Sequence, residues 1–571
     1  MRNYYKNIII AAAGIVLAFS NSSCKKFLAE QPETQYTTSN FFVDKTSLDA
    51  GVVGIYSSVK DLFGVYTNTP LFMTEIGTDE AMFKGTSGVR YNFDRFTFSP
   101  SEGAINEFWI RHFEIATRAN SIIEAANRVN NISATDRNVI IGEARFLRAY
   151  VYFRLVQTFG ELPITDQPAT GDFDYGKPRQ SIKEVYDFIV GDLLFATSGV
   201  LPTAKTNNGH ANHWAAKALL GKVYLTMASA KETATNKTVG KIDGYKTITE
   251  SITDLYTKAW TALKDVKDNS GAALLPVYGD VFKIENKNVN KESLWELQFS
   301  AVVPYGTQWS KEYGMVASGT INGNPAYYTN SLAGQGNEVY VPKFYKYYKP
   351  TLASPDYDKR RVWNLSDSLI NVVNNVPASL TYIWSTFNPD SYNTTILGRC
   401  GVTKYRWGTS WRTTSPYIYS NEPTNVIVLR FADVLLMFAE ADFKKNGTIS
   451  GEGLAAINLV RQRARGLDAV GNPVQPSATP GFNNYTASDI TIDEILMERA
   501  RELCFEFQRW YDLARTGRFE AFLEKTRPVA DTKIVNTSTS FNPAKHYLFP
   551  IPQAELDLST NKDNFKQNPN Y

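Results

Sequence analysis

Three glutamates near the C-terminal end of the chain have a spacing that could support acid–base chemistry. Glu498, Glu502 and Glu506 recur every four residues, so in a continuous helix they would share one face. A glycosidase uses two carboxylates about 5 to 9 Å apart on either side of the scissile bond. Arg501 and Arg509 are interleaved with these glutamates, and a guanidinium group beside a carboxylate lowers its pKa. Ion-paired helix packing is therefore the favoured interpretation, and the sequence predicts no enzymatic activity.

Two other groups of residues could bind a metal ion, and neither has a complete ligand set. His210 and His213 are three residues apart, but no cysteine or carboxylate is close by in the sequence, which favours a turn and a helix cap. Asp356 and Asp358 are followed at once by two basic residues, which favours a solvated turn over a calcium loop. The motifs of zinc proteases, serine hydrolases and phosphate-binding loops are absent from the sequence. The sequence therefore predicts no metal site and no cofactor.

Cys24 closes an N-terminal segment with the pattern of a secretory signal. Basic residues come first, residues 8–19 are an apolar run, and small polar residues precede the cysteine. The run of 12 residues is too short to cross a membrane, which needs roughly 20. We therefore predict that residues 1–23 are a lipoprotein signal peptide and that Cys24 carries the lipid anchor. An ordinary signal with an incidental cysteine is the alternative, and Asn21 favours it because most lipoprotein signals have leucine there.

The composition is that of a globular protein without a nucleic-acid partner. Of the 571 residues, 43% are hydrophobic and 20% are charged, and the formal net charge is +3. Without residues 1–23 the chain has 58 basic and 57 acidic residues, so no basic surface for nucleic acid or for an acidic membrane is predicted. Only Cys400 and Cys504 follow Cys24. They form no disulfide framework, and Cys504 is expected to be a buried free thiol.

Hydrophobic periodicity predicts a mainly helical protein. The segments with a 3.6-residue period in the first half are 46–63, 106–130, 135–160, 182–196, 211–229 and 251–266. Helices are expected again at about 426–446, 452–465 and 492–516. Ser181–Glu184 and Thr491–Glu494 have capping-box spacing at the start of two of these helices. Residues 300–425 are rich in glycine, proline, asparagine and aromatic residues, which predicts long loops with short strands.

Several of the expected helices form antiparallel pairs. Leu220, Gly221 and Tyr224 match the core of a tetratricopeptide helix, in which glycine lets the partner helix approach closely. Trp214 is out of register for the complete pattern. The predicted fold is mainly α, a tetratricopeptide-like superhelix of helical pairs with a long irregular, loop-rich region that carries short strands.

Seven motifs, in order along the chain, resemble those of the SusD/RagB family of nutrient-binding outer-membrane lipoproteins of Bacteroidetes. They are Cys24–Pro32; Trp109 with Arg118–Ile123; Gly142–Ile164; Leu429–Ala441; Ile457–Ala464; Glu498–Arg515; and Phe549–Pro552 with Gln567–Tyr571. The resemblance runs from residue 24 to the last residue. It implies one compact unit made of an N-terminal helical region, 24–230, and a C-terminal region, 231–571, which includes the loop-rich segment 300–425.

The resemblance also implies a function. A member of this family is expected to bind an oligosaccharide or related nutrient and to deliver it to a SusC-like TonB-dependent transporter, over which it opens and closes. It is expected to sit on the outer membrane through a lipid anchor and to need neither catalysis nor a cofactor. Surface export in this phylum often uses acidic residues just after the lipidated cysteine. Here Lys25 and Lys26 follow Cys24, so the surface-facing orientation depends on the resemblance alone.

The family builds its ligand face mainly from two stretches, which correspond here to about 79–95 and 300–412. Flat aromatic rings stack on sugar faces, and amides, carboxylates and guanidinium groups pair with hydroxyls. No family motif covers these positions, so the candidates are chosen by residue type, and many of the rings could instead attach the loops to the core. The candidates are Asp79, Tyr91 and Asn92 in the first stretch and Trp309, Tyr313, Tyr327, Tyr328, Trp384, Trp407 and Trp411 in the second.

Two other functions stay open at the level of the sequence. One is a glycan-degrading lipoprotein enzyme, and the other is a structural lid without ligand affinity of its own. The sequence does not identify the ligand, and peptides or glycoconjugates remain alternatives to a glycan.

Overall fold

The described part of the chain is mainly helical, as the sequence predicts. The computed structural model describes residues 41–63, 69–83, 85, 87–168, 175–205, 208–300, 302, 306–307, 320–321, 324–328, 338–348, 358–365, 368–373, 376–383, 401–402, 404–405, 423–467, 470–475, 482–527 and 540–571. The predicted signal 1–23 and Cys24 lie outside these residues. Asp44–Tyr571 form one unit, and Met1–Val43 belong to another. The predicted boundary between residues 230 and 231 lies inside helix α9 (His213–Asn236), so it separates no structural units.

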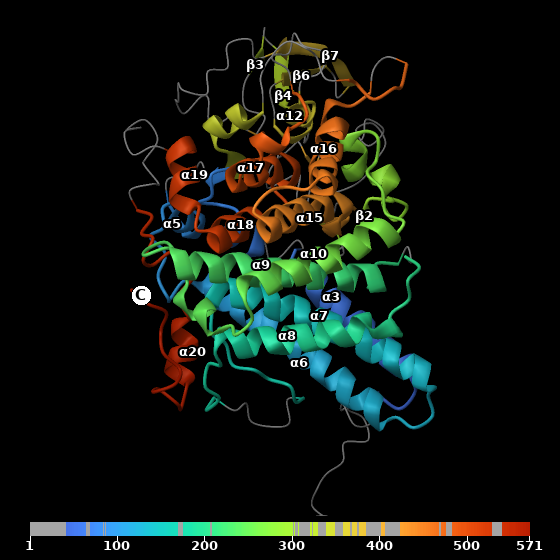
Figure 1. The fold of residues 1–571 in the computed structure, drawn as a ribbon, viewed down its shortest axis with the longest axis vertical. Coiled ribbons are helices and arrows are strands. Elements are labelled where there is room, and N and C mark those ends of the chain that lie inside the picture. Colours follow the sequence, from blue (N-terminus) through green and yellow to red (C-terminus); the bar gives the residue numbers. More distant parts are fainter. Residues whose placement is uncertain are drawn as a thin grey trace, which may run out of the picture. The chain divides into compact units, whose positions relative to one another are not determined.

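Long helices build the first half of Asp44–Tyr571, and every helix predicted there is present (Figure 1). The long helices are α3 (Lys45–Asp61), α6 (Gly103–Arg128), α7 (Ala134–Phe159), α8 (Ile182–Phe195), α9 and α10 (Ile252–Asn269), and the short ones are α4 (Thr69–Thr74) and α5 (Val89–Asp94). Polar side chains define where they begin. The Ser133 hydroxyl accepts from the Asp136 amide at the start of α7, and Ser181 and Glu184 form the predicted capping box of α8.

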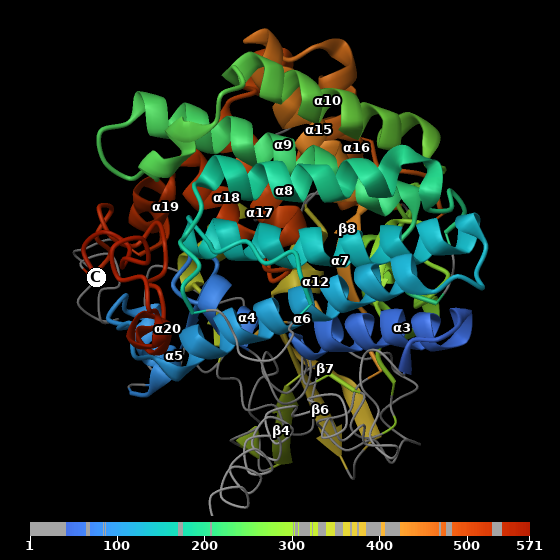
Figure 2. The same cartoon turned by 90° about the horizontal axis from the view of Figure 1, so that it is seen from below.

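Neighbouring helices pack pairwise into a continuous array. α6 packs on α7, α7 on α8, and α9 on α10. The array continues from α10 to α15 (Phe431–Asn446), which packs on α16 (Gly451–Arg465). Figures 1 and 2 show these helices side by side. Stacked helical pairs of this kind are what the sequence predicts.

Gly221 allows a close contact between α9 and α10. A Cβ atom at this position would lie 2.7 Å from Leu263 Cγ on α10, which is closer than side chains pack. Tyr224, one turn further along α9, is buried. The structure therefore confirms the predicted role of Gly221, which lets the partner helix approach closely.

The segment 426–446, predicted as one helix, is a strand followed by a helix. β8 (Val426–Arg430) pairs antiparallel with β2 (Ser293–Leu297), and α15 begins directly after it. The strand starts with three β-branched residues, which favour a pleated strand over a helix. Trp295 on β2 packs edge to face on Phe146 with ring centroids 4.8 Å apart, so the strand pair lies against the helical core.

The segment 492–516, also predicted as one helix, is broken in two. α17 (Ile492–Leu503) ends before a turn, and α18 (Arg509–Thr516) begins after it. Phe505 in the turn has a φ of 61°, a left-handed conformation that a helix does not accommodate. Glu506 also lies in this turn, so it leaves the helical face on which the sequence placed it.

The loop-rich middle of the chain contains short strands, as predicted. One sheet has four antiparallel strands in the order β3 (Thr320–Ile321), β4 (Asn324–Tyr328), β6 (Ser368–Val373) and β7 (Val376–Ile383). β5 (Glu338–Tyr340) pairs instead with β1 (Ala81–Phe83). The remaining elements used below are the 3-10 helix η5 (Pro342–Tyr347), α12 (Arg360–Asn364), α19 (Phe519–Thr526) and α20 (Gln553–Leu558).

Candidate functional site

The two stretches predicted to build the ligand face are joined by main-chain hydrogen bonds. β1 comes from the first stretch and pairs antiparallel with β5 of the second, with Ala81 opposite Tyr340. Next to the strands, the Val341 amide donates to the Glu80 carbonyl at 2.9 Å. The two stretches, which are far apart in the sequence, therefore lie side by side at β1 and β5.

Asp79, a predicted ligand contact, is buried and fully paired. Its side chain has no exposed surface. Arg509 donates to both carboxylate oxygens, at 2.7 and 2.6 Å, and the Tyr347 hydroxyl donates to Oδ2 at 2.8 Å. A buried carboxylate needs such partners, and these leave it no face for a ligand. The prediction that Asp79 contacts a ligand is therefore wrong. Asp79 instead holds the first stretch, 79–95, against α18 and η5.

Two further carboxyl groups are buried beside Asp79. Glu75 and Glu80 have no exposed surface, and the Phe505 amide donates to Glu80 Oε1 at 3.1 Å. Burial raises the pKa of Glu80 to about 7 against the opposing effects of Glu75 and Arg509. Burial and the neighbouring Glu80 carboxyl raise the pKa of Glu75 as well. The segment before α5 therefore contacts the turn after α17 through Glu80, a buried carboxyl whose pKa is raised to about 7.

Tyr91 and Asn92 lie on α5 and are half-buried. The Arg95 guanidinium lies 5.3 Å from the centroid of the Tyr91 ring. Asn92 Nδ2 donates to Glu102 Oε1 at 2.7 Å. Both side chains keep part of their surface accessible, so both remain candidate ligand contacts.

The candidates of the second stretch are described only in part. The backbone at Tyr327 and Tyr328 belongs to β4 and pairs with Ile370 and Leu369 of β6. The other candidates lie outside the described residues: Trp309, Tyr313, Trp384, Trp407 and Trp411.

The carboxylates near residue 500 belong to a buried ion-pair network. Glu498 pairs with Arg461 at 2.7 Å and with Arg501 at 3.0 Å. Arg360 reaches Glu498 at 2.7 Å and Glu502 at 3.0 Å. All of these side chains are buried, so each carboxylate depends on its arginines for compensation of its charge.

Arg430 extends the network to the strand pair. It lies at the end of β8, and its guanidinium donates to Glu502 at 2.6 Å, to Glu506 at 2.8 Å and to Glu292 at 2.8 Å. Arg463 on α16 pairs with Glu292 at 2.9 Å and also with Glu502. Because Glu292 directly precedes β2, the network joins the strand pair to α16, α17 and the turn after α17.

This arrangement does not suit general acid catalysis. Burial alone would raise the pKa of Glu498, but Arg360, Arg461 and Arg501 outweigh it and lower that pKa to about 2. Arginines likewise hold the pKa of Glu502 below its usual range despite burial. A general acid needs a raised pKa and access to substrate. The prediction of ion-paired packing is confirmed, although most partners come from distant segments rather than from the same helix.

The solvated turn predicted at 355–360 is wrong for the part that the structure describes. Asp358 and Arg360 have no exposed surface, and Arg360 donates to Asp358 Oδ2 at 2.8 Å. The segment can be buried because the same guanidinium also pairs with carboxylates of α17. Residues 355–357 lie outside the described residues.

The two histidines form a turn and a helix start, as predicted. His210 Nδ1 lies 2.7 Å from Glu143 Oε2, and the Tyr56 hydroxyl donates to the same oxygen at 2.7 Å. His213 begins α9 directly after its N-cap, Asn212. Within the described ranges, no group of three or more histidine, cysteine, aspartate and glutamate side chains could hold a metal ion.

Cys504 is a buried free thiol, as predicted, and burial raises its pKa. Among the described residues, no helix is both long enough and apolar enough to cross a bilayer.

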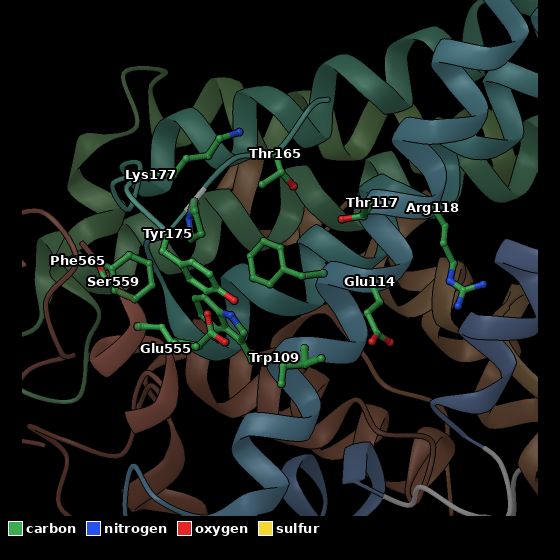
Figure 3. A pocket seen from close by; sticks show the side chains of 14 residues that line it. Trp109, Glu114, Thr117, Arg118, Thr165, Tyr175, Lys177, Glu555, Ser559 and Phe565 are labelled. Carbon is green, nitrogen blue, oxygen red and sulfur yellow. The ribbon is translucent and has the colours of Figure 1, made fainter. Parts of the chain in front are cut away.

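A pocket of about 620 Å³ lies between α6, α20 and the connection between α7 and α8, which we call the connection after α7 (Figure 3). From this connection the pocket is lined by Pro163, Thr165, Tyr175 and Lys177. Trp109 and Thr117 line it from one face of α6, and Tyr175 and Phe565 line it from the connection and from the C-terminal segment. Figure 3 shows the rings of Trp109, Tyr175 and Phe565 at one end of the pocket and Arg118 at the other. Figure 1 shows α6 and α20 at the opposite end of Asp44–Tyr571 from the four-stranded sheet.

The sequence does not predict this pocket. Trp109 and Arg118 belong to a family motif, which gives them no role in a ligand site. Tyr175, Glu555 and Phe565 come from an irregular connection and from the end of the chain. Helical spacing alone indicates that the α6 residues share a face, and no local pattern indicates which distant segments cover that face.

Two family models match separate parts of the chain. The model described as the SusD family matches residues 291–571. The model described as starch-binding and associating with the outer membrane matches residues 26–225. Together they account for both ends of the helical array and for the loop-rich middle.

Curated relatives and solved structures match nearly the whole length of this chain. A SusD-like protein of Bacteroides ovatus is 26% identical over 91% of this chain and 84% of its own length. A SusD homologue of Bacteroides thetaiotaomicron superposes with a TM-score of 0.73 at 21% identity, covering 94% of this chain and 100% of the other. A laminarin-binding SusD-like protein gives a TM-score of 0.66 at 22% identity, covering 93% and 100% of the two chains. A structure with xylogluco-oligosaccharide gives 0.68 at 20% identity, covering 90% and 98%.

The structural matches confirm the predicted fold, a tetratricopeptide-like array of helices with a loop-rich region. The two family models and the relatives agree with the motifs found along the sequence from residue 24 onward. The chain belongs to the SusD family.

Proposed function

We propose that this protein binds a saccharide at the outer membrane and delivers it to a SusC-like TonB-dependent transporter without catalysing a reaction. The observation that carries the proposal is membership of the SusD family along nearly the whole chain. The similar structures that are described as laminarin-binding or as bound to xylogluco-oligosaccharide support a saccharide as the ligand. The family model described as associating with the outer membrane supports the location.

The proposed ligand face combines α5 with the loop-rich middle of the chain. Tyr91 and Asn92 would contribute from α5, and the β1–β5 pairing supports this combination because it joins the two stretches. Aromatic rings in the middle would stack on sugar faces, with polar groups to pair the hydroxyls. The residues proposed for the middle are Trp309, Tyr313, Tyr327, Tyr328, Trp384, Trp407 and Trp411.

A lipid on Cys24 would hold the protein on the membrane after residues 1–23 are removed. Two or three acyl chains anchor a protein stably, whereas one does not. Metabolic labelling with a radioactive fatty acid tests this step. We expect wild-type protein to incorporate the label in the membrane fraction and Cys24→Ser protein to lose it, and labelling of the Cys24→Ser protein would contradict the assignment.

Calorimetric titration of the mature chain with malto-, laminari- and xylogluco-oligosaccharides tests the ligand class. At least one of these saccharides should bind, and changing a ligand-face tryptophan to alanine should weaken that binding tenfold or more, about 1.4 kcal/mol. The variants to compare are Trp309→Ala, Trp384→Ala, Trp407→Ala and Trp411→Ala. Unchanged binding in all of them would make the site assignment wrong. A flat response to every saccharide, with the transporter complex still formed, would favour a purely structural lid.

A reducing-end assay separates binding from hydrolysis. Purified wild-type protein incubated with the same saccharides should release no reducing ends, because the buried glutamates of α17 are paired with arginines. Release that disappears in Glu498→Gln or Glu502→Gln protein would favour a glycan-degrading enzyme instead.

A further inference from the structure

We propose that the pocket between α6, α20 and the connection after α7 is a second saccharide subsite, which accepts the end of a short oligosaccharide. The class of ligand rests on the proposed function, but none of the ligand-face residues contributes to the pocket.

The size and lining of the pocket are those of a small-molecule site. Its volume of about 620 Å³ falls within the roughly 300–1,000 Å³ of ligand pockets. Trp109 and Phe113 line it from buried positions, whereas 38% of Tyr175 and 50% of Leu558 are exposed at its rim. A mainly apolar, aromatic lining suits a ligand with a flat apolar face, and the C–H face of a sugar ring is such a surface.

Hydrogen bonds hold the walls of the pocket together. The Thr560 amide donates to the Tyr175 carbonyl at 3.1 Å. The Arg179 guanidinium donates to the Lys566 carbonyl at 2.6 Å and to Asn568 Oδ1 at 2.7 Å. Tyr175 and Arg179 are therefore fixed to the C-terminal segment without a ligand, and preformed walls avoid the entropic cost of ordering them.

Polar groups line the pocket together with its aromatic rings. The Glu555 carboxyl on α20 is hydrogen-bonded to the Trp109 side chain, and partial burial raises its pKa. Ser559 and Lys177 line the same pocket and supply a hydroxyl and an ammonium group (Figure 3). The Lys177 ammonium group donates to the Ile164 carbonyl at 3.5 Å and retains further donors. A ring that carries several hydroxyls can donate to the free carboxyl oxygen of Glu555 and accept from the ammonium group, whereas a purely apolar ligand would make neither hydrogen bond.

The charges of the pocket select a neutral ligand. Glu114 and Glu555 are balanced by Arg118 and Lys177, so neither a phosphate group nor a polyamine would find a net opposite charge. Because the site is concave and small, it suits one or two sugar units better than a segment of a partner protein.

The test compares two variants of the pocket with one outside it in calorimetric titrations of the mature chain. Tyr175→Ala and Leu558→Ala remove exposed apolar surface at the rim, and Leu194→Ala on α8, where 51% of the leucine is exposed, is the matched control. The probes are maltohexaose, laminarihexaose and a xyloglucan heptasaccharide. We expect one binding event to weaken at least tenfold in both pocket variants and to be unchanged in the control. Thr117→Trp, which would fill the pocket, should abolish the same event.

The outcomes separate this subsite from the ligand face. If the tryptophan variants of the ligand face lose one event and the pocket variants lose another, both sites are supported. If the pocket variants bind every probe as wild-type protein does, the subsite is wrong while the proposed function stands. If only the pocket variants lose binding, the ligand-face assignment fails and the subsite stands. If no probe binds wild-type protein, both are overturned.

Discussion

Most buried charges in the ion-pair network of this protein are compensated by partners from distant segments. The interleaved arginines predict that Glu498 and Glu502 are ion-paired, and the structure confirms the pairing. The identity of the partners could not be predicted, because Arg360 and Arg430 belong to other elements and helical spacing rules extend only one turn. The same limit explains Asp79, whose residue type suggested a ligand contact although its partner, Arg509, lies in α18.

Asp79→Asn is expected to destabilise the protein strongly. The substitution preserves the shape of the side chain but leaves the Arg509 guanidinium buried without a carboxylate. Breaking a buried ion pair from one side costs about 3–5 kcal/mol. The free energy of unfolding from urea denaturation measures the effect.

Asp187→Asn provides the matched control for Asp79→Asn. Asp187 pairs with Lys183 on the surface of α8, where half of its side chain is exposed, and exposed pairs contribute about 0–1 kcal/mol. If Asp79→Asn protein kept wild-type stability and lost only saccharide binding, Asp79 would be a ligand contact after all.

Glu80 is expected to make the protein less stable as the pH rises toward neutrality. Burial raises the folded-state pKa of this carboxyl to about 7 from 4.5. A raised folded-state pKa means that the stabilising contribution is complete below about pH 4.5 and is lost as the pH rises through 7. Glu80→Gln removes the titration but keeps the acceptor for the Phe505 amide. Between pH 5 and pH 8, the variant should therefore lose less unfolding free energy than wild-type protein, by an amount on the order of 2 kcal/mol.

Chemical denaturation at several pH values measures this difference for Glu80→Gln. The control is Glu285→Gln, because Glu285 is exposed. Parallel pH profiles for wild-type and Glu80→Gln protein would mean that the carboxyl is ionised throughout.

Among the elements, the long helices were predictable and their interruptions were not. Hydrophobic periodicity predicts α6, α7 and α10 to within three residues at each end. α6 and α10 alternate buried and exposed positions, whereas α7 is buried on nearly all sides from Ile140 to Phe159. The sequence does not predict the strand β8, because its pairing partner, β2, lies far away in the sequence. It does not predict the break after α17 either, because the turn contains no glycine or proline. Hydrogen bonds to Glu80 and Tyr405 fix the main chain at Phe505, which has a positive φ.

Gly221→Ala is expected to push α9 away from α10. The added Cβ would lie 2.7 Å from Leu263 Cγ, so either the side chain or the helix must shift. Overpacking of this kind costs about 1–3 kcal/mol, more than the helix propensity gained from alanine. The thermal midpoint followed by far-ultraviolet circular dichroism should fall.

Gly191→Ala on α8 is the matched control for Gly221→Ala. No atom lies within 4 Å of a Cβ at Gly191, so only the gain in helix propensity, up to about 1 kcal/mol, applies and the midpoint should rise. Equal midpoints for the two variants would show that α9 and α10 tolerate the extra methyl group and that Gly221 does not set their distance.

At the scale of the whole Asp44–Tyr571 unit, the chain brings together segments that the sequence identifies only separately. The stretches 79–95 and 300–412 were predicted to share a ligand face, and the β1–β5 ladder joins them. The pocket was not predicted, because three segments from different parts of the chain enclose it. The sequence therefore predicts local elements, whereas the pairing of distant segments is seen only in the structure.

Glu502→Gln is expected to lower the stability of the whole unit rather than of one element. Glu502 pairs with Arg360, Arg430 and Arg463, which belong to α12, β8 and α16. Removing the shared carboxylate leaves these guanidinium groups undercompensated, at a cost of about 3–5 kcal/mol. Circular dichroism of the helices and tryptophan fluorescence should therefore shift together to lower urea concentration. Glu452→Gln, at a glutamate whose side chain is 41% exposed and pairs with Lys264 on the surface of α10, should shift neither. If fluorescence shifted in Glu502→Gln protein while the helical signal did not, the segments would unfold independently and the network would not be what joins them.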